Sequence, residues 1–243
     1  MVRLDLWLYQ NGFARSRTHA ANLIKLGRVL INGKTVEKAG TEIHLGDKVE
    51  VIQGDDFASL GGIKLKKALD GFSIDLKDKI AVDIGASNGG FTDVMLKAGA
   101  KKVYAVDVAK CALPKELTDD ERVVVKDCLN ARYLTFEDLG IYADFISIDV
   151  SFISLTYIVP CLIQFLKPNS RIVALIKPQF EVGKAYLTKS GIVKSKKAEE
   201  TAVKAIEKFF LELGFQVEGI LEAPHPFAEK NQEYLISAVW KSL

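Results

Sequence analysis

The stretch KIAVDIGASNGGFTD, Lys79 to Asp93, decides the fold of most of this chain. An apolar run of strand length passes into a glycine-rich turn, and a helix-like segment, 90–98, follows. Similar runs recur downstream with helical segments between them, and runs that are apolar throughout are typical of parallel strands. The pattern therefore predicts a doubly wound α/β sheet with ligands at the carboxyl ends of its strands. The predicted parallel strands are KIAVDIG (79–85), KVYAVDV (102–108), RVVVKDC (122–128), DFISIDV (144–150) and RIVALIK (171–177).

Polar side chains stand at the ends of four of these runs. They are Asp83 with Gly85, Asp107, Asp149 and Lys177. A charged ammonium at the end of a buried strand is costly unless it is paired or does chemistry. Because the carboxyl ends of parallel strands meet at one edge of the sheet, these residues predict a site there. A charged amphipathic helix over 197–213 and two further strands, FQVEGILEA (215–223) and EYLISAVW (233–240), complete the pattern.

The glycine-rich turn favours a nucleoside over a phosphate ligand. It has neither G-x-G-x-x-G nor a G-K-[ST] ending, so a pyrophosphate cradle is not indicated. Gly85, Gly89 and Gly90 allow the backbone to approach a ligand closely. Asp107, at the end of the next strand, can bind both hydroxyls of a ribose. The alternative is a tight strand-to-helix turn with a strand-capping aspartate. A nucleoside held without a phosphate cradle points to S-adenosylmethionine.

The first 52 residues differ from the rest in charge. They hold eight Lys and Arg against five Asp and Glu, although the whole chain has a net charge of only +2. Ser16 can cap a basic helix, and Asn32-Gly33 predicts a type I′ hairpin. The predicted organisation is a small basic α+β domain (1–52), a linker QGDDFASLGG (53–62) and a larger domain (63–243). A basic module is a candidate for binding a polyanion, or a solvated surface.

Composition excludes several other classes of protein. The chain has 49% apolar residues, enough for a sizeable core. Its three cysteines form no C-x-x-C pair and do not cluster with the three histidines, which argues against disulfides and against a metal site. A reducing cytoplasm fits best, and Asp5 interrupts any secretory signal core. The uncharged segment 150–166 is predicted to be a core strand leading into a buried helix rather than a membrane span.

The N-terminal segment resembles a known RNA-binding domain. RLDLWLYQNGFARSRTHAANLIKLGRVLINGKTVEKAGTEIHLGDKVEV, 3–51, has the Ser-Arg helix start, the Asn-Gly hairpin and the Gly-Asp ending of the domain named after ribosomal small-subunit protein four. That family holds structured RNA with the face formed by its basic helix and hairpin. The resemblance implies RNA contacts by Arg15, Arg17, Lys25, Arg28 and Lys34.

The larger domain resembles the TlyA-type methyltransferases, relatives of the FtsJ/RrmJ ribose methyltransferases. The motifs that carry the resemblance are DIGASNGGFTDVML, VYAVDV, DVSFISL, ALIKPQFE and NQEYLI. It implies a Rossmann-like class I methyltransferase sheet and methyl transfer to a ribose 2′-hydroxyl, of a cytidine, in ribosomal RNA or ribosomal subunits. The implied catalytic set is Lys64, Asp149, Lys177 and Glu233; the implied cofactor contacts are Asp83, Gly85, Ser87, Gly89, Gly90, Asp107 and Asn130.

Ribose methylation requires removal of a proton from a weakly nucleophilic hydroxyl. Lys177 is the predicted base, although a free lysine has a pKa of about 10.4 and must be neutral to act. We expect Asp149 and Glu233 to orient it and Lys64 to steady the developing alkoxide. Two other functions stay open: a haemolysin-like membrane-active protein, because relatives carry that name, and an RNA-binding factor that holds the cofactor without turnover.

Overall fold

The computed structural model describes residues 1–52, 57–224 and 231–241. The chain divides into two compact units, Met1–Leu60 and Gly61–Leu243. The predicted linker, 53–62, falls at this division. Its residues 53–56 lie outside the described part of the chain, and its last two glycines begin helix α3 (Gly61–Gly71) instead of continuing a linker.

The N-terminal unit is a small α+β module, as predicted. Ser16 accepts a hydrogen bond from the His19 backbone N–H at 3.0 Å and caps α2. Asn32 and Gly33 both have positive φ, as a type I′ turn requires, and they join β2 to β3. A core of apolar side chains, among them Leu4, Leu8 and Ile24, fixes the helices on the strands. The elements are β1 (Val2–Arg3), α1 (Leu4–Gln10), α2 (Arg17–Lys25), β2 (Val29–Ile31), β3 (Lys34–Thr35), β4 (Glu42–Ile43) and β5 (Val49–Val51).

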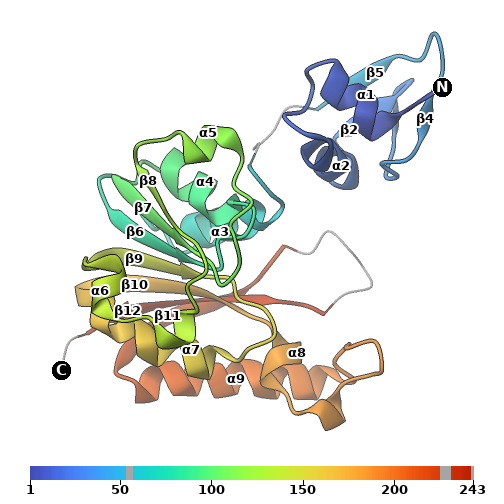
Figure 1. The fold of residues 1–243 in the computed structure, drawn as a ribbon. Coiled ribbons are helices and arrows are strands. Elements are labelled where there is room, and N and C mark those ends of the chain that lie inside the picture. The colour runs from blue at the N-terminus through green and yellow to red at the C-terminus, as the bar shows by residue number, and fades with distance from the viewer. Residues whose placement is uncertain (53–56, 225–230, 242–243) are drawn as a thin grey trace. The chain divides into compact units, whose positions relative to one another are not determined.

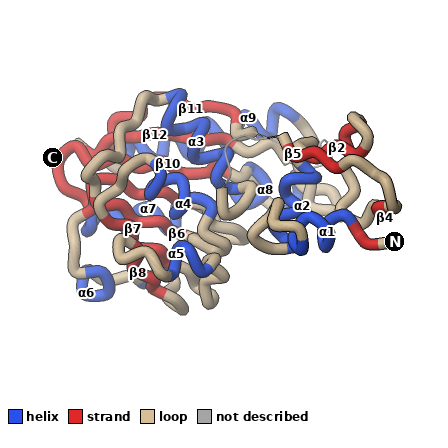
Figure 2. Tube along the Cα trace, turned by 90° about the horizontal axis from the view of Figure 1, so that it is seen from above, coloured by secondary structure: helices blue, strands red, loops and turns tan. Residues whose placement is uncertain are grey.

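The second unit is built on one sheet with the strand order β11-β12-β10-β9-β6-β7-β8. The strands from β10 to β8 in this order are parallel to their neighbours, whereas β12 runs antiparallel to both β10 and β11. The edge strands β11 and β8 lie at opposite sides of the sheet (Figure 2). The strands are β6 (Ile80–Ile84), β7 (Lys102–Val106), β8 (Val123–Lys126), β9 (Ala143–Ile148), β10 (Leu166–Ile176), β11 (Phe215–Glu222) and β12 (Tyr234–Trp240).

Helices cover both faces of this sheet (Figure 1). Helices α3 and α4 pack together on one face, and α7 and α9 on the other. The α9 helix shows how the sequence produces this layer: Ser195 caps it, and Ala198, Ala202, Ile206 and Phe210 form its buried stripe. The helices after α3 are α4 (Gly90–Lys97), α5 (Lys115–Thr118), η1 (Ala131–Tyr133), α6 (Phe136–Leu139), α7 (Leu155–Leu162), η2 (Ile163–Phe165), α8 (Pro178–Glu181), η3 (Lys184–Tyr186) and α9 (Lys196–Glu212).

Two predictions about this unit need correction. The β8 strand is half-exposed rather than buried on both faces, because it is an edge strand of the sheet. The segment 150–166 does not begin with a strand: β9 ends at Ile148, a loop follows, and α7 begins at Leu155. The helix part of that prediction is confirmed. Among the residues that the structure describes, no helix is long and apolar enough to cross a bilayer.

Candidate active site

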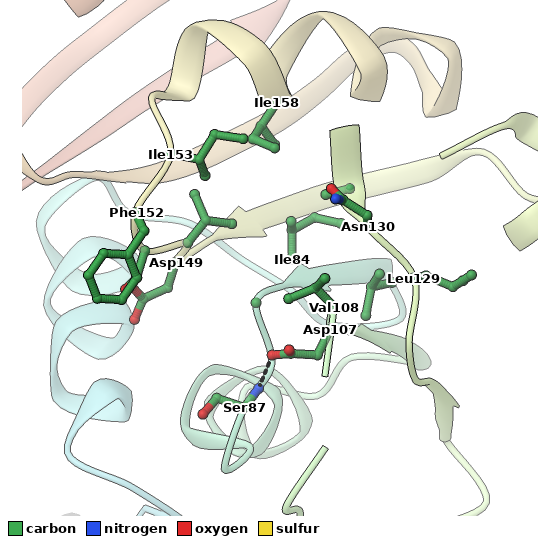
Figure 3. Close-up of a pocket in the computed structure, with 15 residues that line it drawn as sticks. Ile84, Ser87, Asp107, Val108, Leu129, Asn130, Asp149, Phe152, Ile153 and Ile158 are labelled. Carbon is green, nitrogen blue, oxygen red and sulfur yellow. Dashed lines mark hydrogen bonds between the residues drawn. The ribbon is translucent and has the colours of Figure 1, made fainter. Parts of the chain in front are cut away.

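A cavity of about 430 Å³ opens at the carboxyl ends of β6, β7 and β9. Polar residues from three strand ends contribute to it, namely Ser87, Asp107 and Asp149. Its apolar wall includes Ile84, Val108, Leu129, Ile153 and Ile158. Figure 3 shows Asp149 and Phe152 at one end of this pocket and Leu129 and Asn130 at the other. The two ends of the pocket therefore differ in character: a charged carboxylate lines one end, and mainly apolar side chains line the other.

Asp107 stands between these two ends. Its Oδ2 accepts a hydrogen bond from the Ser87 backbone N–H at 2.9 Å, drawn dashed in Figure 3, and its Oδ1 accepts one from the Ala109 N–H at 2.9 Å. These bonds fix the carboxylate in place and leave each oxygen a further lone pair. Two adjacent hydroxyl groups, as on a ribose, are the natural donors for such a carboxylate. Asn130 caps η1 by accepting from the Arg132 N–H, which holds it at the apolar end.

Asp83, a predicted cofactor contact, does not line the pocket and has a structural role within the sheet. Its side chain is fully buried inside the sheet and accepts hydrogen bonds from Thr92 Oγ1 at 2.7 Å and Ser147 Oγ at 2.9 Å. It has no exposed surface in this structure and ties β6 to α4 and β9, and its contact with the cofactor stays a prediction. Gly89 and Gly90 also stand outside the pocket lining and form the start of α4, whereas Gly85 and Ser87 line it.

Burial of Asp83 makes the stability of the chain depend on pH. Desolvation raises the pKa of Asp83 to about 6, although the hydrogen bonds from Thr92 and Ser147 oppose this shift. The ionised form of Asp83 is thus disfavoured in the folded state. The contribution of its protonated form to the unfolding free energy is fully present below about pH 4 and is lost as the pH rises through about 6. We expect the wild type to lose about 2–3 kcal/mol more of its unfolding free energy than Asp83→Asn between pH 4 and 7. Urea unfolding of both proteins checks this; parallel pH profiles would contradict it.

The four predicted catalytic residues form two ion pairs. Lys177 Nζ lies 2.7 Å from Asp149 Oδ1, and Lys64 Nζ lies 2.5 Å from Glu233 Oε2. All four side chains are largely shielded from solvent, with 11% to 22% exposed. The predicted contact of Glu233 with Lys177 is therefore replaced by a bond to Lys64. Asp149 also lines the pocket, which places the Lys177 pair at its charged end.

Different elements deliver these side chains. Lys177 follows β10 directly and Asp149 follows β9, so the parallel pairing of the two strands brings them together. Lys64 comes from the first turn of α3, and Glu233 precedes β12, where the Ala223 N–H donates to the Glu233 carbonyl at 2.8 Å. Burying four charges without partners would be prohibitive, so the pairing is what permits this site to exist.

One residue of this cluster was missed by the sequence analysis. Lys177 Nζ also donates a hydrogen bond to Ser151 Oγ at 2.9 Å, and Ser151 lines the pocket together with Phe152. Phe152 is 90% exposed and has a φ of 65°, a conformation that costs a bulky residue roughly 1–2 kcal/mol. The signal for Ser151 was the motif SFISL, which begins with this serine two residues after Asp149.

The predicted RNA-binding residues lie in the N-terminal unit, on or next to α2 and the β2–β3 hairpin. Arg15, Arg17, Lys25 and Lys34 are exposed and Arg28 is half-buried. Arg17 donates to Asp5 Oδ2 at 3.0 Å, so it also has a structural contact within the unit. Together with a stronger bond from Arg3, this contact lowers the pKa of Asp5 to about 2, against the opposing effect of burial. Across the described ranges, no cluster of three or more His, Cys, Asp or Glu is placed to hold a metal.

Comparison with known proteins agrees with this geometry. Residues 57–240 match the FtsJ-like methyltransferase model, and residues 2–49 match the S4 domain model. The chain is 39% identical to the 16S/23S rRNA (cytidine-2'-O)-methyltransferase TlyA of Mycobacterium tuberculosis, with 97% of this chain and 88% of that protein covered. It is 37% identical to Hemolysin A of Brachyspira hyodysenteriae, with 96% and 98% covered.

Solved structures agree as well. A hemolysin-named protein of Streptococcus thermophilus is 38% identical, covers 99% of this chain and 89% of its own, and superposes with a TM-score of 0.77. The Aeropyrum pernix fibrillarin structure, at 16% identity and a TM-score of 0.52 over 74% of both chains, shares the fold. The Rossmann-like sheet, the pocket at its strand ends and these matches lead to one conclusion: the chain belongs to the FtsJ-like methyltransferase family and carries an S4 domain before its methyltransferase domain.

Proposed function

We propose that this protein transfers the methyl group of S-adenosylmethionine to a ribose 2′-hydroxyl, of a cytidine, in ribosomal RNA. The observation that carries the proposal is the Lys177–Asp149 pair, which stands at the charged end of a pocket suited to a nucleoside. The relatives named as rRNA (cytidine-2'-O)-methyltransferases support the same reaction. Ribosomes work in the cytoplasm, and we place the protein there.

The residues of the pocket fit S-adenosylmethionine. The Asp107 carboxylate suits the ribose hydroxyls, and the apolar wall near Leu129 and Asn130 suits the adenine ring. Gly85 lines the pocket with a φ of 87°, in the left-handed region that favours glycine. Asp149, at the opposite end of the pocket from Leu129 and Asn130, would then lie on the side of the methionine end of the cofactor.

The proposed reaction needs one proton acceptor and one stabiliser of negative charge. When bound, S-adenosylmethionine supplies an electrophilic methyl group that passes to the ribose oxygen and leaves a neutral thioether, while the hydroxyl proton passes to Lys177. Lys177 therefore enters the step as a neutral amine and leaves it as an ammonium, which Asp149 stabilises. Lys64, held by Glu233, stabilises with its positive charge the negative charge that develops on the ribose 2′-oxygen when that hydroxyl loses its proton.

The test is methyl transfer from labelled S-adenosylmethionine to ribosomal subunits that lack the modification. We expect label in ribosomal RNA, at a nucleotide whose phosphodiester bond resists alkaline cleavage because its 2′-oxygen is blocked. Label on a base, or label on protein only, would contradict the proposed substrate. Tight binding of RNA and cofactor without transfer would favour a non-catalytic binding factor, and leakage of liposomes would favour a membrane-active protein.

The N-terminal unit provides a separate prediction about RNA affinity. Lys34 is an exposed residue of the β2–β3 hairpin, and Lys34→Glu places a negative charge where we expect a phosphate. The dissociation constant for the subunit should rise about tenfold at low salt, and the slope of log affinity against log salt should fall by about one. Lys208→Glu is the matched control, since Lys208 is an exposed lysine of α9 in the other unit. Equal effects of both changes would show that only net charge matters.

A further inference from the structure

Two oxygen atoms lie close to Nζ of the base Lys177, and the second of them has no role in the reaction described above. Asp149 Oδ1 forms an ion pair at 2.7 Å, and Ser151 Oγ accepts a hydrogen bond from Nζ at 2.9 Å. Both residues belong to one short loop, at the carboxyl end of β9, and both line the pocket. The lysine side chain is only 11% exposed.

The number of acceptors has a chemical consequence. A lysine ammonium carries three N–H bonds, whereas the neutral amine that can accept a proton has two N–H bonds and one lone pair. When Ser151 receives one N–H bond, rotation about the Cε–Nζ bond is restricted and two tetrahedral directions are left for the second N–H bond and the lone pair. The negative charge of Asp149, an ion-pair partner without a hydrogen bond to its Oδ1, favours the arrangement with the N–H bond toward the carboxylate and the lone pair away from it. Without Ser151, the amine rotates about its Cε–Nζ bond and the lone pair samples several directions. Ser151 is thus the group that fixes the direction from which Lys177 accepts a proton.

The loop that carries Ser151 is locked to the helix that follows Lys177. The rings of Phe152 and Phe180 have centroids 5.1 Å apart, which joins the loop to α8. Ser154 Oγ donates to Glu181 Oε2 at 2.5 Å, and the Leu155 N–H donates to Glu181 Oε1 at 3.0 Å. Burial raises the pKa of Glu181, and these two bonds partly offset the shift.

This locking explains how Ser151 keeps its place although it lies in a loop. The left-handed backbone at Phe152 turns the chain directly after Ser151, and strained residues of this kind persist where surrounding contacts hold them. The contacts at Phe180 and Glu181 are such contacts, and both follow Lys177 within four residues. The motifs SFISL and KPQFE therefore form one interlocked unit, with the Ser151–Lys177 bond as its innermost contact.

We infer that Ser151 is a positioning residue for methyl transfer: its hydroxyl takes one N–H bond of neutral Lys177 and, with the charge of Asp149 beside the amine, directs the lone pair at the incoming ribose hydroxyl. The inference rests on the proposed function, because it assigns a role within that reaction. It also predicts that Ser151 acts on the rate of the proton-transfer step rather than on cofactor or RNA affinity.

The test compares Ser151→Ala with the wild type in single-turnover methyl transfer to unmodified subunits at saturating S-adenosylmethionine, over a series of pH values. We expect the limiting rate at high pH to fall about tenfold, less than the loss expected for removing the base itself. The rise of the rate with pH should move to lower pH, because the lost hydroxyl no longer stabilises the ammonium. Ser151→Thr keeps a hydroxyl and should restore both the rate and the profile.

Ser154→Ala is the matched control, since it removes a serine hydroxyl from the same loop that contacts Glu181 and not Lys177. It should lower thermal stability and leave the position of the pH profile unchanged. A Ser151→Ala enzyme with wild-type rate and profile would overturn the inference and leave the proposed function standing. A lower rate with an unmoved profile would also overturn it, because a merely structural role behaves in that way. Absence of transfer by the wild type would overturn the proposed function and this role together.

Discussion

Lys177→Arg is expected to lower the single-turnover rate of methyl transfer by about 10²–10⁴-fold, although it keeps the positive charge beside Asp149. An arginine can maintain the ion pair that the structure shows at 2.7 Å, but it cannot release a proton to become a base. Lys177→Ala should lose at least as much, and it also leaves Asp149 without its partner. Rates from quench-flow mixing of enzyme, cofactor and subunits give the measurement.

The control for this prediction comes from the other end of the same strand. Lys167 lies near the start of β10 and pairs with Asp144 at 2.6 Å, so Lys167→Arg repeats the substitution in a similar ion pair far from the pocket. It should transfer methyl groups at the wild-type rate. Cofactor binding, measured by calorimetry, should stay within about twofold in all these variants. Full activity of Lys177→Arg would disprove the base and leave Lys177 an electrostatic role only.

Gly85→Ala is expected to abolish measurable cofactor binding and to lower the unfolding free energy by about 2–5 kcal/mol. Gly85 has a φ of 87°, which strains an alanine by roughly 1–2 kcal/mol. A Cβ there would also lie less than 3.0 Å from the backbone carbonyl of Asp149, so β6 or β9 must shift. Overpacking of this kind typically adds about 1–3 kcal/mol. The shift would displace the pocket wall and the Lys177–Asp149 pair together.

Gly140→Ala separates the two causes. Gly140 also has a positive φ, of 63°, but a Cβ at that position meets nothing within 4 Å. It should cost only the strain of the backbone and leave cofactor binding intact. Chemical unfolding and calorimetric titration with S-adenosylmethionine measure both quantities. If the two variants lose equal stability and bind the cofactor equally, the contact between Gly85 and the Asp149 backbone has no importance for the pocket.

A hydrogen-bonded cluster next to Glu233 in the sequence shows what a sequence pattern does not reveal. Tyr234 donates a short hydrogen bond to Glu199, and Lys196 donates to both, at 2.6 Å to Glu199 and 2.8 Å to Tyr234. These residues join the first turn of α9 to the start of β12, directly beside Glu233. Nothing in the spacing of a charged helix and a strand 35 residues later predicts such a contact. It exists because the tertiary fold places the two elements together.

The sequence by itself determined the order of the elements and the place of the site. Apolar runs and turn residues are local signals, so they predicted the strands from β6 to β12, the capped helix α2 and the Asn32-Gly33 hairpin, although β10 begins five residues before its predicted start at Arg171. Strand polarity then predicted that Asp107, Asp149 and Lys177 gather at one edge, because parallel strands all end there. The family motifs named Lys64 and Glu233 as well, which no local signal separates from surface charges.

Only the tertiary structure decided which of these residues touch. In the structure, Glu233 pairs with Lys64, and Lys177 contacts Asp149 and Ser151. Asp83 is buried within the sheet, where it accepts a hydrogen bond from Thr92. Each outcome depends on side-chain directions and on distances between strands. A difference of a few ångströms in these distances changes which side chains pair, and the sequence pattern does not specify it. The periodicity of apolar residues predicts which face of a helix or strand is buried. Hydrogen bonds between elements, in contrast, depend on the packing of the whole domain. For this reason the site could be located from the sequence, and its division into two ion pairs could not.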